Sequence, residues 1–129
     1  YYLYHKFRLY WLGYDVKIVQ DNEIGSRNKH SSKKEDISMY INNLDDCFSE
    51  MGRVLKKDKF LVVVIGDSVI RGKLIKLDHA LNEIATKHNF VLIREMACSL
   101  KDNSKMFNPK FAREGKLEYI MFFQNKKEN

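Results

Sequence analysis

The sequence predicts an α/β fold in which parallel strands and a last antiparallel strand form a sheet flanked by helices. The first observation is a solid apolar run at residues 60–65 that ends on Gly66 and Asp67, and such a β-branched run is typical of a strand buried on both faces. The second is a helical pattern at residues 74–85, which precedes another apolar run at 90–97 and implies a parallel crossover. The third is a loop without a helical pattern before the last strand, residues 117–124, which is therefore expected to run antiparallel.

The bulk composition indicates one basic globular domain. The 129 residues fit a single domain, 1–129, and the net charge of +6 is a general indication of a polyanionic partner such as nucleic acid. No apolar run approaches ~18 residues, and the first residues lack the charged-then-apolar order of a signal peptide, so we expect no membrane span and a cytoplasmic location. Cys47 and Cys98 lack CxxC spacing and a nearby His, which predicts reduced structural thiols and no metal site.

Residues 1–13 are predicted to form an amphipathic helix. Leu3, Phe7, Tyr10 and Trp11 recur at helical spacing, and Gly13 is a natural helix stop. We expect most of these aromatic side chains to pack into the core, although one or two near the N-terminus could line a pocket.

Residues 14–36 are predicted to form a long polar loop, and long loops in compact domains are usually functional or disordered. Composition alone does not decide whether this loop is only solvated or grips phosphates. The side chains that would make such contacts are Arg27, Lys29, Lys33 and Lys34.

The clearest helix is predicted over residues 36–55. Asp36 or Ser38 is expected to cap it, and Gly52 inside it costs up to ~1 kcal/mol against Ala, which predicts close packing against a neighbouring element. Its apolar stripe recurs at steps of three and four and consists of Ile37, Tyr40, Ile41, Leu44, Phe48, Met51 and Leu55.

A candidate site lies where the apolar run 60–65 ends. In open α/β sheets, ligands bind outside the carboxyl ends of the strands, so we expect a site first at Gly66 and Asp67, although both residue types are also common turn formers. Arg71 and Lys73 follow this strand end and could contact phosphates. A second polar and basic loop, residues 99–117, contains Lys101, Lys105, Phe107, Lys110, Phe111, Arg113 and Lys116.

Four passages resemble class I S-adenosylmethionine-dependent methyltransferases that modify amino groups of nucleic-acid bases. Tyr4-His5-Lys6-Phe7-Arg8-Leu9-Tyr10-Trp11-Leu12-Gly13 looks like the helix that follows the catalytic Pro-Pro-Tyr motif, and Glu23-Ile24-Gly25-Ser26-Arg27 is similar to the loop segment found next. Residues 50–58 resemble the helix and Arg-Val-Leu-Lys-Pro-Gly-Gly passage before strand five, with Lys57-Asp58-Lys59 in place of Pro-Gly-Gly. Val64-Ile65-Gly66-Asp67-Ser68 matches the end of that strand in the DNA-modifying subset.

The resemblance implies a partial Rossmann-like methyltransferase sheet, in which the seventh strand runs antiparallel and inserts between the fifth and the sixth. It also implies a function, which is to be part of an enzyme that methylates an exocyclic amino group of a base in DNA, of the restriction-modification type. The alternatives are a fragment of a tRNA or RNA methyltransferase, and a non-catalytic basic module that binds nucleic acid.

Two motifs of the family are absent from the 129 residues. There is no glycine-rich cofactor loop and no Pro-Pro-Tyr motif, since Pro109 is the only proline. Both motifs would lie before Tyr1, so we expect residues 1–129 to be the C-terminal part of a methyltransferase catalytic domain. S-adenosylmethionine is the cofactor implied for the complete enzyme, but the chain alone is predicted neither to bind it nor to methylate, and no catalytic residue is assigned.

The resemblance further implies a pocket for a base flipped out of the duplex. Gly66 and Asp67 would form one wall, and Phe107 or Phe111 matches by position the family's second stacking aromatic, with a loop anchor as the alternative role. Asp67 is not expected to act as a base, because methyl transfer to an amine depends more on positioning. DNA, rather than RNA, would be gripped through its phosphates by Arg27, Lys29, Lys33, Lys34, Arg71, Lys73, Lys105, Lys110 and Arg113.

The strand at residues 60–65 also raises the question of a partner. If the sheet stopped there, a very apolar strand would be left as an open edge, which is an aggregation hazard. We therefore expect this edge to pair with missing N-terminal sequence or with another chain, including a second copy.

Overall fold

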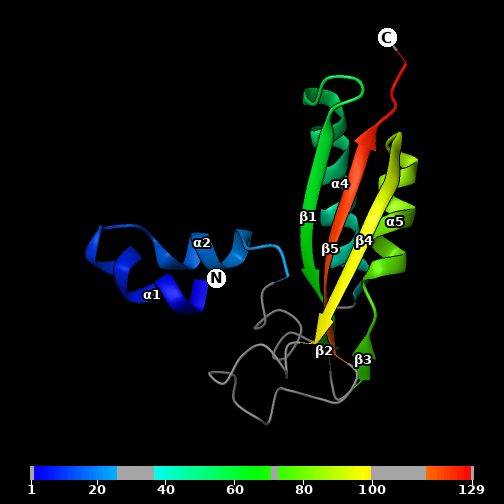
Figure 1. The fold of residues 1–129 in the computed structure, drawn as a ribbon. Coiled ribbons are helices and arrows are strands. Elements are labelled where there is room, and N and C mark those ends of the chain that lie inside the picture. Colours follow the sequence, from blue (N-terminus) through cyan, green and yellow to red (C-terminus); the bar gives the residue numbers. More distant parts are fainter. Residues whose placement is uncertain (1, 26–36, 71–72, 100–115, 129) are drawn as a thin grey trace. The chain divides into compact units, whose positions relative to one another are not determined.

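A computed structural model describes residues 2–25, 37–70, 73–99 and 116–128 of the chain (Figure 1). The chain divides into two compact units, residues 1–43 and residues 44–129. The expectation that both belong to one catalytic domain stays a prediction.

The first unit contains the helices α1 (Tyr2–Trp11) and α2 (Val16–Asn22). The first helix is confirmed, and it is followed by Gly13 with a φ of 76°, a conformation that glycine adopts without strain. The predicted loop over residues 14–36 is wrong at residues 16–22, where α2 forms. Its cap explains the helix, because the Asp15 carboxylate accepts hydrogen bonds from the backbone N–H groups of the first helical turn.

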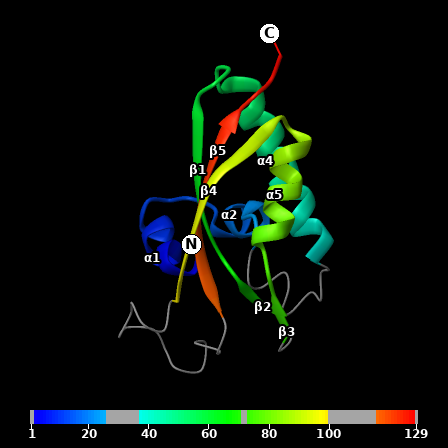
Figure 2. The same ribbon diagram turned by 45° about the vertical axis from the view of Figure 1, so that its right-hand side comes forward.

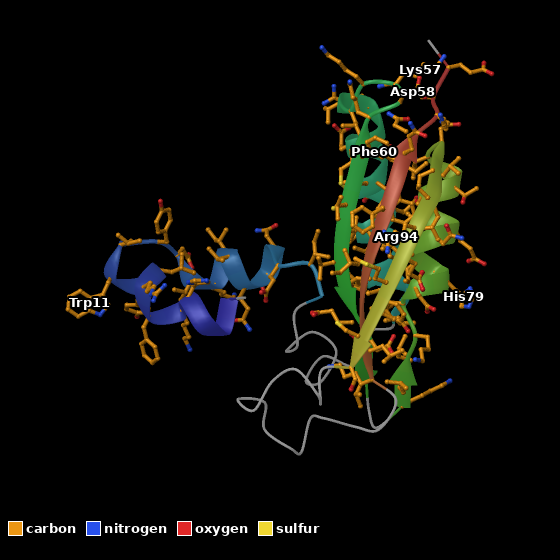
Figure 3. The ribbon with its side chains drawn as sticks, viewed as in Figure 1. Trp11, Lys57, Asp58, Phe60, His79 and Arg94 are labelled. Atoms are coloured by element: carbon orange, nitrogen blue, oxygen red, sulfur yellow. The ribbon has the colours of Figure 1, made fainter. Side chains whose placement is uncertain are left out.

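Three aromatic side chains of α1 are exposed. Trp11 (Figure 3) is 91% exposed, and Phe7 and Tyr10 are exposed as well. The predicted core packing of this stripe is therefore wrong for these three residues. Two helices of ten and seven residues offer each other little apolar surface, so they cannot bury such a stripe between themselves.

The helix α4 (Ile37–Val54) confirms the helix predicted over residues 36–55. Its Gly52 also confirms the predicted close packing. A methyl group placed on Gly52 would lie 3.3 Å from the backbone oxygen of His88, which is tighter than ordinary van der Waals contact. Glycine therefore allows the end of α4 to approach the segment around His88, which precedes the strand at residues 90–99.

The second unit contains a three-stranded sheet whose strands follow the order β1-β5-β4. The strands are β1 (Phe60–Gly66), β4 (Phe90–Ser99) and β5 (Leu117–Asn125). β5 runs antiparallel to both of its neighbours, so β1 and β4 point in the same direction on either side of it. This arrangement confirms the insertion of the last strand that the resemblance implied.

Parallel pairing is not confirmed among the described strands, because every ladder in the described part of the chain is antiparallel. The crossover from β1 to β4 does place the two strands in the same direction. It leaves a gap one strand wide, however, and β5 fills that gap. Periodicity reports which residues form a strand but not which strand lies beside it.

The crossover itself contains a small hairpin before its helix. β2 (Ser68–Ile70) pairs antiparallel with β3 (Lys73–Ile75), and α5 (Asp78–Lys87) follows. The helix predicted within residues 74–85 therefore begins four residues later than expected. The hairpin returns the chain to the end of β1 before α5 starts.

The core of the second unit lies on one face of the sheet, which α4 and α5 cover (Figure 2). Phe48 of α4 packs edge-to-face against Phe90 and Phe123, with ring centroids 5.9 Å apart in both pairs. Such aromatic pairs add to the stabilisation from burial. The remaining buried apolar residues of this core are Ile65, Leu77, Leu81, Ile84, Ala85, Tyr119 and Met121.

The opposite face of the sheet is open in the described part of the chain. Phe60, which Figure 3 labels, is 60% exposed, and Val62 and Val64 are 51% and 60% exposed. No described strand pairs with the outer edge of β1. The predicted burial of this strand on both faces is therefore wrong for the described residues. Burial of the second face would require an element beyond those that the structure describes, which agrees with the open edge considered above.

Candidate functional site

The carboxyl end of β1 is held in place by the side chain of Asp67, which is only 2% exposed. One carboxylate oxygen accepts a hydrogen bond from Leu117 N at 3.1 Å, and the other accepts from Leu77 N at 3.4 Å. The backbone N–H of Asp67 also donates to Leu117 O at 2.8 Å. One aspartate thus joins the end of β1 to the start of β5 and to the residue before α5.

Lys76 forms an ion pair with this buried carboxylate. Its Nζ lies 3.0 Å from Asp67 Oδ2 and donates to the Tyr119 hydroxyl at 3.3 Å. The hydrogen bond to Asp67, followed by that to Tyr119, raises the pKa of Lys76, whereas burial raises the pKa of the Tyr119 phenol. A carboxylate inside the fold is costly unless it is paired and hydrogen-bonded, and these contacts meet that requirement.

Sequence reasoning missed Lys76, although a signal for it exists. Ser68 lies opposite Ile75 in the β2–β3 hairpin, so residues 67 and 76 are the next pair outward. An acid and a base at these two positions indicate an ion pair only once the hairpin register is known.

Gly66 lies beside Asp67 but is differently placed. It is opposite Glu118 in the β1–β5 ladder, and a methyl group placed on it would have Leu117 O as its nearest neighbour, at 3.8 Å. The described residues therefore leave space at this position. The strand end thus combines the Asp67 carboxylate, which is held by hydrogen bonds and an ion pair, with Gly66, which has no side chain.

Most of the other predicted contact residues lie outside the described residues. Lys73 is described, and it is an exposed residue of β3 opposite Ile70. The ten that lie outside are Arg27, Lys29, Lys33, Lys34, Arg71, Lys105, Phe107, Lys110, Phe111 and Arg113. The structure thus brings Gly66 and Asp67 together, and the pocket role of both stays a proposal.

The described residues do not fit S-adenosylmethionine. The four described glycines, Gly13, Gly25, Gly52 and Gly66, stand singly, and none lies in a loop that leads from a strand directly into a helix. A phosphate- or nucleotide-type cofactor loop of this fold class needs closely spaced glycines there. Within the described ranges no group of three or more His, Cys, Asp or Glu side chains could hold a metal ion.

The opposite end of β1 carries a basic turn, residues 56–59 (Figure 3). Asp58 has a φ of 60°, its N–H donates to Asn125 O at 2.8 Å, and its carboxylate pairs with Lys126 at 2.8 Å. The hydrogen bond from Lys126 lowers the pKa of Asp58. The left-handed backbone explains why the resembling passage has glycine here. This turn lies about 20 Å from Gly66, given the rise per residue of a strand.

Comparison with known proteins is consistent with this architecture. Two solved structures of a candidate DNA modification methylase from Thermus thermophilus are similar to the chain. The selenomethionine derivative has a TM-score of 0.57 at 20% identity over 74% of this chain and 40% of that one. The complex with S-adenosyl-L-methionine has a TM-score of 0.55 at 18% identity over 82% and 42%.

At this level of identity, the two structures show the shared fold. The chain spans about two fifths of the length of that protein. No curated protein is significantly similar to it in sequence, and none of the described helices is long and apolar enough to cross a membrane.

The family is shown by a sequence model. The model of a family described as DNA methylase matches residues 8–129, which is nearly the whole chain. The match includes α4, the open strand β1, the Asp67 strand end and the inserted strand β5. The chain therefore belongs to the DNA methylase family.

Proposed function

We propose that the chain is part of a methyltransferase that uses S-adenosylmethionine to modify an exocyclic amino group of a base in DNA, in a restriction-modification setting in the cytoplasm. The observation that carries this proposal is the family match over residues 8–129 together with the strand order β1-β5-β4. The match supports DNA over RNA as the substrate. A fragment of an RNA methyltransferase is the second candidate.

The contribution of this chain would be one wall of the base pocket. Gly66 and Asp67 lie at the carboxyl end of β1, which is the edge where α/β sheets bind their ligands. Because the Asp67 oxygens are used by Leu77, Leu117 and Lys76, Asp67 would act by holding the wall in position. Methyl transfer to an amine gains most from such positioning.

The two basic segments that the sequence predicts to be loops, residues 26–34 and 101–116, would supply the contacts to the nucleic acid. Phe107 or Phe111 would stack on the flipped base, and the basic side chains of both loops would bind phosphates in a salt-dependent manner. If the chain is instead a non-catalytic module, it would make only these contacts to nucleic acid. A phosphate grip without methyl transfer would be its signature.

The cofactor would be bound by a segment that carries the glycine-rich loop and the Pro-Pro-Tyr motif, since neither occurs among the 129 residues. We propose that this segment pairs with residues 60–65 on the open edge of β1 and ends before Gly66. The partner would be either a preceding part of the same polypeptide or a second chain.

The test is a methyl-transfer assay with labelled S-adenosylmethionine on duplex DNA and on RNA. The isolated chain is expected to transfer no label. The coding sequence upstream of Tyr1 should contain a Pro-Pro-Tyr motif, and the protein that includes it should methylate adenine N6 or cytosine N4, identified by mass spectrometry of the nucleosides.

Three results would contradict the proposal. Transfer by the isolated chain at the rate of a full enzyme would refute its dependence on a second segment. Labelling of RNA but not DNA would favour the second candidate, and binding of DNA without any transfer by the longer protein would favour the non-catalytic module.

A further inference from the structure

The described glycines differ in whether the fold itself requires them. Gly13 and Gly25 have positive φ, and a methyl group added to Gly52 would lie 3.3 Å from the backbone oxygen of His88. Gly66 has neither feature, since its nearest neighbour would be 3.8 Å from an added methyl group and its backbone is that of a strand. Glycine inside a strand is less stabilising than alanine, so the described fold gains nothing from glycine at this position.

The polar backbone groups of Gly66 point away from β5, toward the open edge of the sheet. Asn125 N donates to Lys59 O at 2.9 Å, and Asp67 N donates to Leu117 O at 2.8 Å. The odd-numbered residues of β1 therefore bond to β5, because the register between these two ends is regular. Backbone groups alternate along a strand, so the N–H and C=O of Gly66 face the open edge.

The Cα atom of Gly66 belongs to the open face of the sheet. Exposed Val64 lies two residues earlier on that face, and Glu118 lies opposite Gly66 in the ladder. The next residue, Asp67, is locked by its buried carboxylate. The result is a rigid position with a donor, an acceptor, an apolar neighbour and no side chain.

We propose that Gly66 is a specificity-determining position at which the planar ring of the target nucleobase lies against bare backbone. The ring would contact the Gly66 Cα and the Val64 side chain, and the free N–H and C=O would read its hydrogen-bonding edge. Glycine is then required by the substrate, because a side chain at residue 66 would occupy the space of the ring. This inference rests on the proposed function and adds the residue that selects the base.

The test is a titration of the isotope-labelled chain with deoxyadenosine and deoxycytidine monophosphates, followed by NMR. Deoxyribose 5-phosphate is the base-free control. The backbone amides of Gly66 and Asp67 are expected to shift with a base-bearing ligand and not with the control. Equal shifts with the base-free ligand, or no shift at Gly66, would overturn the inference.

Two variants sharpen the experiment. Gly66→Ala is expected to melt at the same temperature as the wild type or higher, and to bind the nucleotide about tenfold more weakly, as expected when one methyl group too many enters a fitted pocket. Val62→Ile adds the same group further along the same face and should bind normally. Unchanged nucleotide binding by Gly66→Ala would refute the role of Gly66.

The outcome is separable from that of the proposed function. If the longer protein methylates DNA while Gly66→Ala binds nucleotide normally, the base contact is wrong and the methyltransferase assignment stands. If the longer protein methylates neither nucleic acid, the assignment fails whatever the titration of Gly66 shows.

Discussion

The carboxylate of Asp67 and the ammonium group of Lys76 lie 3.0 Å apart, with the aspartate side chain fully buried and the lysine side chain 46% exposed. The pair lies between the end of β1 and the start of α5. It therefore fixes the strand end at which the base pocket is proposed. Because the Lys76 side chain is partly exposed, the pair can be tested both by substitution of the lysine and by a change of pH.

Removal of the Asp67 carboxylate should destabilise the second unit strongly. Asp67→Ala leaves the N–H groups of Leu77 and Leu117 without their acceptor and Lys76 without its counter-ion. We expect a loss of about 3 kcal/mol in the free energy of unfolding, as is typical when one partner of a buried pair is removed. Urea denaturation measures this loss.

Lys76→Met is the matched variant. It removes the cation but keeps both backbone hydrogen bonds to Asp67, so it should destabilise the chain less than Asp67→Ala. The raised pKa of Lys76 means that its contribution is complete below the pKa of an unfolded lysine and is lost as pH rises through the higher folded value. The alkaline loss of stability should therefore be smaller in Lys76→Met, and an identical alkaline profile would contradict the role of the pair.

A second ion pair should control stability on the acid side. Asp45 of α4 pairs with Lys87 at 2.6 Å and with His88 at 2.8 Å, both at the end of α5. The hydrogen bonds from Lys87 and then His88 lower the pKa of Asp45. A lowered pKa stabilises the fold above the pKa of an unfolded aspartate, which is about 3.9, and this stabilisation is lost as pH falls through the folded value.

Asp45→Asn should therefore flatten the acid limb of the stability curve below about pH 4. Thermal melting between neutral and strongly acidic pH gives the measurement. Asp46→Asn is the control, because Asp46 is the exposed neighbouring residue and forms no ion pair with any described residue. Equal flattening in both variants would show that the effect comes from net charge alone.

The turn before β1 offers a test of backbone strain. Asp58 adopts a left-handed conformation with a φ of 60°, which costs a non-glycine residue roughly 1 kcal/mol. Asp58→Gly should be more stable than Asp58→Ala by about 1 kcal/mol, since both lose the exposed ion pair with Lys126 and only glycine relieves the strain. Chemical denaturation of the two variants decides this, and a more stable Asp58→Ala would contradict the prediction.

The open edge of β1 predicts self-association of the isolated chain. An apolar edge strand invites pairing with another strand, and a lysine on it discourages such pairing. Val62→Lys should therefore shift the chain toward monomer in analytical ultracentrifugation. Ile18→Lys, a substitution of an exposed apolar residue of α2, should not. A stable monomer of the wild-type chain at all concentrations would show that the edge needs no partner.

The apolar stripe of residues 37–55 was enough to predict α4, because a helix with one buried face repeats every three to four residues. Gly52 could likewise be interpreted from sequence, since an unfavourable residue inside a helix indicates close packing. Asp15 was available as a cap signal for α2, but the polar composition of residues 14–36 concealed it.

The same patterns could not predict which strands lie side by side in the sheet. The run at residues 60–65 predicts a strand but not whether both of its faces are covered, because coverage depends on elements distant in the chain. The insertion of β5 came only from the resemblance. The paired position of Asp67 and Lys76 depended on the register of the β2–β3 hairpin, which local sequence does not specify.

By itself, the sequence predicted α1, α4, α5, the strands β1, β4 and β5, the family resemblance and a candidate site at Gly66 and Asp67, because these depend on local periodicity and short motifs. Only the tertiary structure decided that Asp67 is an internal anchor and Gly66 an open position. The reason is physical. Two adjacent residues of a strand have side chains on opposite faces and backbone groups that point in opposite directions, and packing against Lys76, Leu77 and Leu117 decides which of the two is buried.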